Sequence, residues 1–268
     1  MSYFEVAILA SGSKGNAALI RAETQYFLVD MGLSCRELVR RLGQVHIKPE
    51  QLSAIFITHE HIDHIKGLTT FTKKYTVPIY SSERTWRAIL AKENGINRQA
   101  CHIIDTNVSY NNVKISSFPI PHDAIDPHGY TFEELTSGAK CTYATDTGFV
   151  TDAVRCAAED AELLILEANH DVEMLINGRY PAVLKQRILS TRGHLSNDSA
   201  GQLLASLAKQ PQEVFLAHLS EENNRPELAL STVTAFLKRA GNEQKIKIHV
   251  ALQHEVVTNF KVQQEILF

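Results

Sequence analysis

Four imidazole and carboxylate side chains that can bind metal ions fall within six residues of the run Thr58-His59-Glu60-His61-Ile62-Asp63-His64. The apolar segment from Ala54 to Thr58 predicts a short buried strand before them. If the backbone stays extended, His59 and His61 project to the same side, because side chains alternate along a strand. Asp63 and His64 then turn toward a second position. We therefore expect this one loop to serve two adjacent metal ions.

Three further candidate ligands stand alone later in the chain, each after an apolar or β-branched segment. They are His122 in Ile-Pro-His-Asp, Asp146 in Ala-Thr-Asp-Thr-Gly and His218 in Leu-Ala-His-Leu-Ser. A metal site built at the ends of several strands needs such isolated imidazole and carboxylate ligands. The alternative is a set of surface histidines at a helix start, with Asp63 as the helix cap. The three later residues favour the metal hypothesis.

The length of 268 residues fits one domain spanning residues 1–268, because no linker, repeat or low-complexity segment divides the chain. The net charge of -3 gives no global signature of a nucleic-acid-binding protein, so a local patch or bound metal would have to attract a polyanion. The first ten residues contain Glu5 and match neither a signal peptide nor a membrane span. We therefore expect a cytoplasmic protein without membrane contact. The oligomeric state stays open, a homodimer included.

The chain contains four cysteines, Cys35, Cys101, Cys141 and Cys156, which are widely spaced and form no Cys-x-x-Cys pair. This spacing argues against a zinc ribbon and against a disulfide framework. We expect all four to be reduced residues buried in the core.

Strand and helix signals alternate along the chain. An antiparallel meander is expected at Tyr3 to Ala10, Ala17 to Arg21 and Tyr26 to Asp30. Later strands are expected at Ala54 to Thr58, Val77 to Ser81, Val113 to Phe118, Lys140 to Thr145, Leu163 to Glu167, Val214 to Ala217 and Ile246 to Leu252. Helices are expected at Cys35 to Leu42 with Ser34 as N-cap, Lys48 to Glu50, Gly67 to Tyr75, Glu83 to Glu93, Asn197 to Ala208 and Pro226 to Ala240. This order predicts an α/β fold in which two sheets pack between helices.

The order of the candidate ligands resembles the metallo-β-lactamase superfamily, which has a His-x-His-x-Asp-His loop, a later His, a bridging Asp and a final His. The resemblance spans nearly the whole chain and implies a four-layer αββα sandwich of two mixed sheets flanked by helices. It also implies two divalent metal ions. One would be held by His59, His61 and His122, the other by Asp63, His64 and His218, and Asp146 would bridge them. Mn²⁺ and Zn²⁺ suit these ligands, and Fe is a further option.

Three other segments resemble the YycJ (WalJ) branch of this superfamily, a bacterial group regarded as 5'-to-3' exodeoxyribonucleases. They are LASGSKGN at residues 9–16, VDMG at residues 29–32 and GHLSN at residues 193–197. The branch implies a hydrolase that cleaves phosphodiester bonds, with DNA as its substrate. Two cations would lower the pKa of a shared water and so supply a bridging hydroxide for the attack.

The resemblance also implies roles for residues beside the ligands. Asp30 matches an aspartate that supports the histidine loop instead of binding metal, unless it is an ordinary turn residue. His194 resembles a histidine of tRNase Z and RNase J that contacts the scissile phosphate or protonates the leaving oxygen, and Glu167 resembles its supporting carboxylate. With Asp63, these two form the expected catalytic set. The alternatives are a helix cap at residues 193–197 and a solvated carboxylate at Glu167.

Contacts with the substrate phosphate are expected from two small polar segments. The first contains Ser11, Ser13, Lys14 and Asn16, and the second contains Ser196 and Asn197. Backbone N–H groups of a glycine-rich loop and a lysine suit a phosphate, although a hairpin turn would use the same glycines. The second segment follows His194 and can equally cap a helix.

Other members of the superfamily act on different substrates, so alternatives stay open. A β-CASP ribonuclease is excluded by length, because only 47 residues separate Asp146 from His194. The leading alternative is a small-molecule, cyclic phosphodiesterase of the PhnP type. RNA processing like that of tRNase Z is disfavoured because no Gly/Pro-rich arm is visible. A non-hydrolytic diiron protein is disfavoured because such proteins have Glu where this chain has His61.

Overall fold

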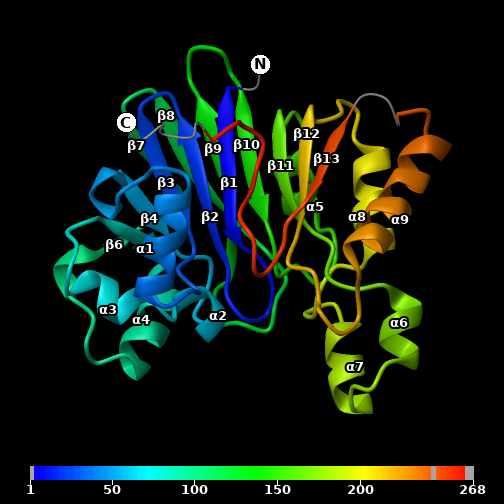
Figure 1. The fold of residues 1–268 in the computed structure, drawn as a ribbon, viewed down its shortest axis with the longest axis horizontal. Helices are drawn as coiled ribbons and strands as arrows, with labels where there is room; N and C mark the ends of the chain where they lie inside the picture. Colours follow the sequence, from blue (N-terminus) through cyan, green and yellow to red (C-terminus); the bar gives the residue numbers. More distant parts are fainter. Residues whose placement is uncertain (1–2, 243–245, 263–268) are drawn as a thin grey trace, which may run out of the picture.

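The computed structural model describes residues 3–242 and 246–262. Two seven-stranded sheets stand face to face, and helices cover their outer sides (Figure 1). The predicted arrangement of two mixed sheets flanked by helices is therefore confirmed. That residues 1–268 form one domain stays a prediction.

The first sheet contains the opening meander. Its strands, in spatial order, are β14 (Val257–Thr258), β1 (Phe4–Ala10), β2 (Ala17–Ala22), β3 (Gln25–Val29), β4 (Ala54–Phe56), β5 (Ile79–Ser81) and β6 (Cys101–Ile103). Pairing is antiparallel from β14 to β3 and parallel from β3 to β6. Val29 of β3 lies opposite Phe56 of β4. The residues that follow these two strands, Asp30 and the histidine run, therefore start side by side.

The second sheet contains the strands that precede the isolated ligands. In spatial order they are β13 (Lys247–Val250), β12 (Glu213–Ala217), β11 (Leu163–Glu167), β10 (Lys140–Ala144), β9 (His128–Glu134), β8 (Val113–Pro119) and β7 (Asn107–Tyr110). Pairing is parallel from β13 to β10 and antiparallel from β10 to β7. Glu167 of β11 lies opposite Ala217 of β12, which places Glu167 beside the residue before His218.

Apolar side chains from both sheets fill the space between them. Phe27 and Phe56 from the first sheet meet Phe132 and Tyr130 from the second. The ring centroids of Phe56 and Tyr130 are 5.3 Å apart, and those of Phe27 and Phe132 are 5.5 Å apart. Strands buried on both faces read as continuous apolar runs, which is why most of them were predictable.

Helices pack on the outside of each sheet. On the first sheet lie α1 (Cys35–Gln44), α3 (Leu68–Thr72) and α4 (Glu83–Lys92), with the 3-10 turns η1 (Pro49–Gln51) and η2 (Arg98–Ala100). On the second lie α5 (Asp152–Ala158), α8 (Asn197–Ser206) and α9 (Pro226–Arg239). Ser34 caps α1 as predicted, because its Oγ accepts a hydrogen bond from the backbone N–H of Glu37 at 3.3 Å.

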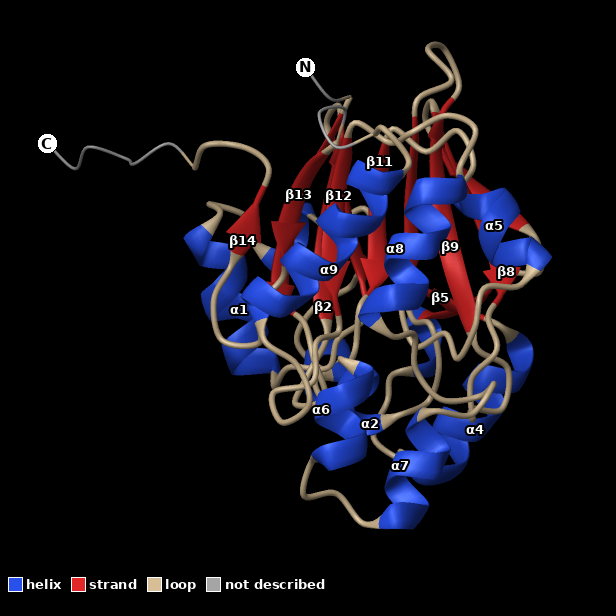
Figure 2. Ribbon diagram, turned by 90° about the vertical axis from the view of Figure 1, so that its right-hand side faces the viewer, coloured by secondary structure: helices blue, strands red, loops and turns tan. Residues whose placement is uncertain are grey.

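Three short helices lie at one end of the molecule, beyond the ends of the strands (Figures 1 and 2). They are α2 (Ile62–Ile65), α6 (Val172–Asn177) and α7 (Ala182–Ile188). None of these three helices was predicted, because each is short and partly polar. The helix α5 and the strands β6, β7, β9 and β14 were not predicted either, although β9 is seven residues long. Among the described residues, no helix has both the length and the hydrophobicity needed to cross a lipid bilayer.

The cysteines differ from the prediction in their burial. All four are free, and Cys35 and Cys141 are buried as expected. The prediction was wrong for Cys101, which is half-buried at η2 and β6, and for Cys156, which is exposed on α5. A helix on a sheet exposes its outer face, and Cys156 lies on that face.

Candidate metal centre

The loops that follow β4, β8, β10 and β12 meet at the end of the sheets where α2 lies (Figure 1). They bring all seven predicted ligands together. Among the described residues, four groups of side chains have ligand atoms within 4.8 Å of one another. Two of them match the predicted sets: His59, His61 and His122 form one, and Asp63, His64 and His218 form the other. In each of these two sets, two residues come from the histidine run at residues 59–64, which follows β4 of the first sheet. The third residue comes from a loop of the second sheet.

Asp146 lies between these two groups. One of its carboxylate oxygens is 3.4 Å from Nε2 of His64. The other is 3.9 Å from Nε2 of His122 and 3.4 Å from Nδ1 of His218. The carboxylate is buried between the two groups, and these distances place it within reach of a metal ion in either one.

Three buried ligand atoms have no hydrogen-bond partner among the described residues: Nε2 of His59, Nε2 of His218 and Oδ2 of Asp146. A buried polar atom left without a partner is destabilising by about 1–3 kcal/mol. Each of these atoms can offer a lone pair to a cation. Imidazole and carboxylate donors suit Mn²⁺, Zn²⁺ and Fe. The side chains present therefore fit a metal centre.

Asp30 holds the histidine run in place. Its Oδ2 lies 2.8 Å from Nδ1 of His64, and its Oδ1 accepts a hydrogen bond from the backbone N–H of Thr58 at 2.9 Å. The hydroxyl of Thr58 lies 2.9 Å from Nδ1 of His59. With Nδ1 engaged in both rings, Nε2 is the atom available to an ion, and the ring orientation is fixed. This network goes beyond the contacts of an ordinary turn aspartate.

Glu167 connects two histidines to the ends of three strands. Its Oε1 lies 2.8 Å from Nδ1 of His194 and 2.9 Å from Nδ1 of His218. Its Oε2 accepts hydrogen bonds from the backbone N–H groups of Thr147 at 2.8 Å and Leu195 at 3.0 Å. The side chain is 0% exposed, which excludes the alternative that it is solvated.

Three residues of the site adopt a left-handed backbone conformation, which residues other than glycine rarely adopt. The φ angle is 63° at Asp30, 56° at Asp146 and 56° at His218. Each follows the end of a strand, and the conformation destabilises the chain by about 1–2 kcal/mol per residue. Such strain concentrates at functional sites, because the surrounding structure must hold it in place.

Acidic side chains dominate the electrostatics around His64 and His218, whereas burial lowers the pKa values of His59 and His122. Burial alone would lower the pKa of His218, but Asp146, Asp63 and Glu167 raise it to about 10. Burial also opposes the charged form of His64, yet its acidic neighbours, Asp30 first among them, raise its pKa well above the usual value. The site therefore attracts positive charge, as a pair of cations would require.

Asn16, predicted to contact a phosphate, instead packs against two of the candidate metal ligands. Its Nδ2 lies 3.1 Å from Nε2 of His64 and 3.4 Å from Oδ2 of Asp63. Its backbone N–H donates to the carbonyl oxygen of Asp63 at 2.8 Å, and its Oδ1 accepts from the N–H of Gly12 at 2.9 Å. The side chain is buried, so this placement favours a supporting role over a contact with substrate.

The other residues of the same loop divide into buried and exposed ones. Ser11 is buried, and its Oγ accepts a hydrogen bond from the backbone N–H of His218 at 2.6 Å. This contact also favours support over substrate binding. Ser13 and Lys14 are exposed, and Nζ of Lys14 pairs with Glu221 at 2.6 Å. A phosphate contact by these two residues stays a prediction.

Ser196 and Asn197 begin α8. Ser196 is its N-cap and accepts a hydrogen bond from the backbone N–H of Ser199 at 3.1 Å. Asn197 is fully buried and exchanges two side-chain hydrogen bonds with Asn224, at 3.0 and 2.9 Å. A substrate contact by Asn197 does not fit this burial. Helix capping, the alternative considered for this segment, describes Ser196.

Sequence reasoning missed several polar residues that hold the site. Asn224 also donates to the carbonyl oxygen of Ala168 at 2.9 Å, and Asn169 donates to the carbonyl oxygen of His218 at 2.8 Å. These amides tie the ends of β11 and β12 to α8. Asparagines in loops are common, so no sequence signal marked these.

Two arginines were also missed. Nε of Arg187 lies 2.5 Å from Oδ2 of Asp123, whose other oxygen is 3.2 Å from Nε2 of His122. Nε of Arg192 donates to the carbonyl oxygen of His122 at 3.2 Å. Both arginines therefore lie beside one ligand group, although nothing in their sequence context pointed there.

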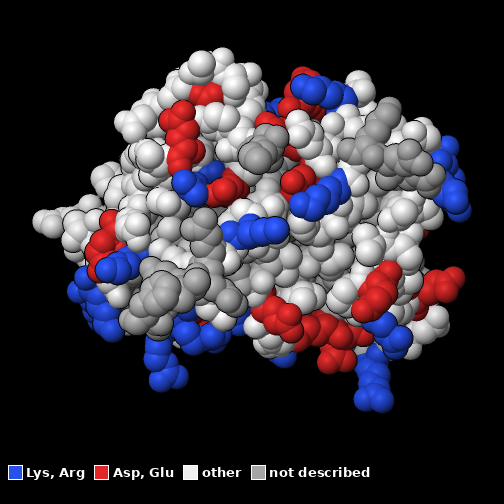
Figure 3. Space-filling view, turned by 45° about the horizontal axis from the view of Figure 1, so that its top comes forward, with Lys and Arg blue, Asp and Glu red and all other residues white. Residues whose placement is uncertain are grey.

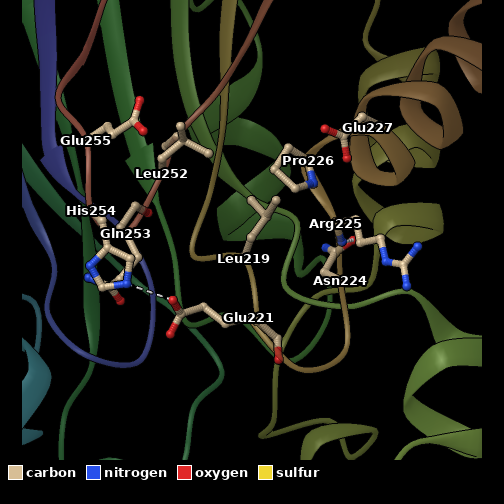
Figure 4. A pocket seen from close by; sticks show the side chains of 13 residues that line it. Leu219, Glu221, Asn224, Arg225, Pro226, Glu227, Leu252, Gln253, His254 and Glu255 are labelled. Atoms are coloured by element: carbon tan, nitrogen blue, oxygen red, sulfur yellow. Dashed lines mark hydrogen bonds and ion pairs between the residues drawn. The ribbon is translucent and has the colours of Figure 1, made fainter.

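A pocket of about 440 Å³ opens beside the metal centre, between the loop after His218 and residues 251–255 (Figure 4). Leu219 and Leu252 line its apolar part, and Nε2 of His254 lies 2.8 Å from Oε1 of Glu221 at its edge. None of the seven predicted ligands lines it. Ser11 and Leu219, which also line the pocket, connect it to the loop that contains His218.

A family model and two curated relatives agree on the family of this chain. Residues 25–219 match the model of the family described as the beta-lactamase superfamily domain. The chain is 40% identical over 245 residues to exodeoxyribonuclease WalJ of Streptococcus pneumoniae serotype 2 (strain D39 / NCTC 7466), covering 88% of this chain and 89% of that one. It is 37% identical over 238 residues to exodeoxyribonuclease YycJ of Bacillus anthracis, with the same coverage of 88% and 89%.

Solved structures show the same fold. The metallo-beta-lactamase fold protein YhfI from Bacillus subtilis superposes with a TM-score of 0.70, covering 96% of this chain and 99% of that one at 17% identity. At this identity the likeness concerns the fold alone. It confirms the predicted four-layer arrangement.

Proposed function

Because this chain belongs to the beta-lactamase superfamily and, within it, to the family of the WalJ and YycJ exodeoxyribonucleases, we propose that it is a metal-dependent exodeoxyribonuclease. The observation that carries this proposal is the identity of 40% across nearly the full length of both chains. The proposed substrate is linear DNA, degraded from the 5' end. The cytoplasmic location belongs to the same proposal, and a homodimer stays a prediction.

Seven side chains are proposed to hold two divalent metal ions. His59, His61 and His122 would hold one, Asp63, His64 and His218 the other, and Asp146 would contact both. The unpartnered atoms of His59, His218 and Asp146 support this assignment. When bound, such ions lower the pKa of a water and offset negative charge on the phosphate. Mn²⁺ or Zn²⁺ is proposed, with Fe as an option.

His194 is proposed to protonate the leaving oxygen. Glu167 binds its Nδ1 at 2.8 Å, which leaves Nε2 free to donate a proton. Its side chain is 16% exposed, so substrate can reach the ring. A positioned acid of this kind contributes about 10²- to 10⁴-fold to a rate. Asp63, whose side chain is 20% exposed, is proposed to orient the attacking water as well as to bind metal.

Digestion of end-labelled DNA tests this proposal. Linear DNA with a 5'-phosphate is incubated with the protein and Mn²⁺, with the label at the 5' end in one sample and at the 3' end in another. We expect the 5' label to be released early as mononucleotide, while the 3' label stays on gradually shorter fragments. The Asp63→Ala and His64→Ala variants should lose this activity and keep the fold. Hydrolysis of bis(p-nitrophenyl) phosphate without any cleavage of DNA would instead support the small-molecule phosphodiesterase.

A further inference from the structure

Between Glu167 and His194 the chain leaves the second sheet and forms α6 and α7. We call residues 172–192 the helical projection. It lies at the same end of the molecule as α2, beyond the ends of the strands (Figures 1 and 2). Most residues from 179 to 192 are exposed. The projection therefore contributes few side chains to the core, and the need for a core does not explain its composition.

Large apolar side chains are exposed on the helical projection. Ile176 is 54% exposed, Val183 79% and Leu189 47%. Phe149, which is 44% exposed, lies near its base, because a Cβ added to the neighbouring Gly148 would be 2.4 Å from the carbonyl oxygen of Thr191. Three of these four side chains belong to one stretch of 14 residues, from 176 to 189, so the helical projection offers apolar surface to a binding partner.

The helical projection is also basic, although the whole chain has a net charge of -3. It contains one acidic residue, Glu173, and four basic ones: Arg179, Lys185, Arg187 and Arg192. By contrast, basic and acidic side chains are interspersed on the face at the opposite end (Figure 3). A polyanion is therefore attracted to the projection more than to that face.

Hydrogen bonds connect the helical projection to the metal centre. Arg187 pairs with Asp123 at 2.5 Å, and Arg192 donates to the carbonyl oxygen of His122 at 3.2 Å. The carbonyl oxygen of Gly193, directly after the projection, lies 3.1 Å from Nδ1 of His122. A strand lying on the projection would therefore reach the metal centre on the side of His122.

We propose that the helical projection binds the unpaired 5' strand of the DNA substrate, an inference that rests on the proposed function. Duplex DNA presents phosphates at its surface and keeps its bases stacked inside, so exposed Ile, Val and Leu side chains would find no apolar partner. An unpaired strand offers bases to apolar and aromatic side chains and phosphates to basic ones. The mixture of the two kinds of side chain on the projection matches that combination.

A binding experiment with two forms of one DNA tests this inference. Both are 5'-phosphorylated duplexes of the same sequence, one blunt and one with a single-stranded 5' extension, and their terminal linkages are phosphorothioates that resist hydrolysis. Affinity is measured by fluorescence anisotropy in Mn²⁺. We expect the wild-type protein to bind the extended form about tenfold more tightly than the blunt form.

Two variants of exposed residues and one control complete the design. The triple variant Ile176→Ser/Val183→Ser/Leu189→Ser should bind the extended and the blunt form with about equal affinity. In Arg179→Ala, the affinity for both forms should fall, and the slope of log affinity against log salt should decrease by about one. The control, Lys238→Ala/Arg239→Ala, removes two exposed basic residues at the far end of α9 and should keep both the preference and the slope.

Each failure has a different signature. An unchanged preference in the triple variant, or no preference in the wild-type protein, would overturn the role of the helical projection, whether or not the protein degrades DNA. A preference that the triple variant loses, in a protein that leaves unprotected DNA intact, would support the binding surface and reject the proposed exonuclease.

Discussion

One carboxylate oxygen of Glu167 lies 2.8 Å from Nδ1 of His194, at the end of β11. The residues are 27 positions apart, and the buried position of Glu167 fixes which nitrogen of the histidine faces the site. A carboxylate in this position fixes the orientation of the ring. The activity of His194 should therefore depend on this contact with Glu167.

Replacing Glu167 with glutamine is expected to lower kcat on DNA by about 10- to 100-fold. Glutamine has one accepting oxygen, so it cannot accept hydrogen bonds both from the two histidine rings and from the backbone N–H groups of Thr147 and Leu195. The dependence of kcat on pH should change at the same time, which loss of packing alone would not cause. The matched control is Glu213→Gln, which alters another glutamate–histidine pair, at 2.9 Å from His249 and outside the metal centre. Equal kcat values for the two variants would remove Glu167 from the proposed mechanism.

Replacing Asn16 with alanine should weaken the binding of the metal ion assigned to Asp63, His64 and His218. The amide nitrogen is 3.4 Å from Oδ2 of Asp63 and steadies that ligand. Loss of such a supporting contact weakens metal affinity by about 10- to 100-fold. Isothermal titration with Mn²⁺ measures this directly. Asn107→Ala, on the surface strand β7, is the control, and two ions bound to Asn16→Ala with wild-type affinity would contradict the prediction.

The buried pair Asn197 and Asn224 should stabilise the fold as a unit. Each single change to alanine removes both hydrogen bonds between the two amides and should lower the free energy of unfolding by about 1–3 kcal/mol. The double variant should lose less than the sum of the two, because the same hydrogen bonds are removed only once. Urea denaturation of the three variants measures this coupling. Strict additivity would show that the two hydrogen bonds contribute nothing as a pair.

Acid should weaken the contribution of Glu37 on α1. Hydrogen bonds from Arg40, with those from Arg41, lower the pKa of Glu37 to about 2. A carboxylate with a lowered pKa stabilises the folded state above its unfolded pKa of about 4.5, and this contribution is lost as the pH falls toward 2. The side chain is partly exposed, so we expect Glu37→Gln to be less stable by about 1 kcal/mol or less at pH 7.

Urea denaturation of wild-type protein and Glu37→Gln at pH 7 and at pH 3 checks this prediction. The difference between the two proteins should shrink at the lower pH. A second test replaces Arg41, the other partner of Glu37. Besides contacting Glu37, Arg41 donates hydrogen bonds from Nη1 to the carbonyl oxygens of Leu9 and Gln253. Arg41→Ala should therefore be more destabilising than Glu37→Gln. The reverse order would mean that the contacts of Arg41 with these two carbonyl oxygens add little to the stability of the fold.

The candidate metal ligands could be recognised in the sequence because their signals are local. The histidine run is six residues long, and the isolated ligands follow apolar strands that can be recognised from burial on both faces. The structure brings the predicted residues together, and their roles stay proposals. Ser34 was predictable for the same reason, since a helix cap acts on a residue three positions away.

Other features depend on long-range contacts and could not be predicted. Asn16 meets His64 across 48 positions, and Asn197 meets Asn224 across 27. Their neighbours in sequence contain no trace of these contacts. The helices of the projection were missed because short, exposed segments have no strong apolar period. Cys156 was misplaced because composition does not tell which face of a helix a residue takes.

Each group of ligands takes two residues from the loop after β4 and one from a loop of the opposite sheet. A bound ion would therefore cross-link the two halves of the sandwich at the end where no strand pairing joins them among the described residues. Ligands that bind only the folded state raise its stability in proportion to the logarithm of their concentration. The ions proposed to take part in catalysis would thus also stabilise the packing of the two sheets, and a chelator would lower the stability of the fold as well as abolish activity.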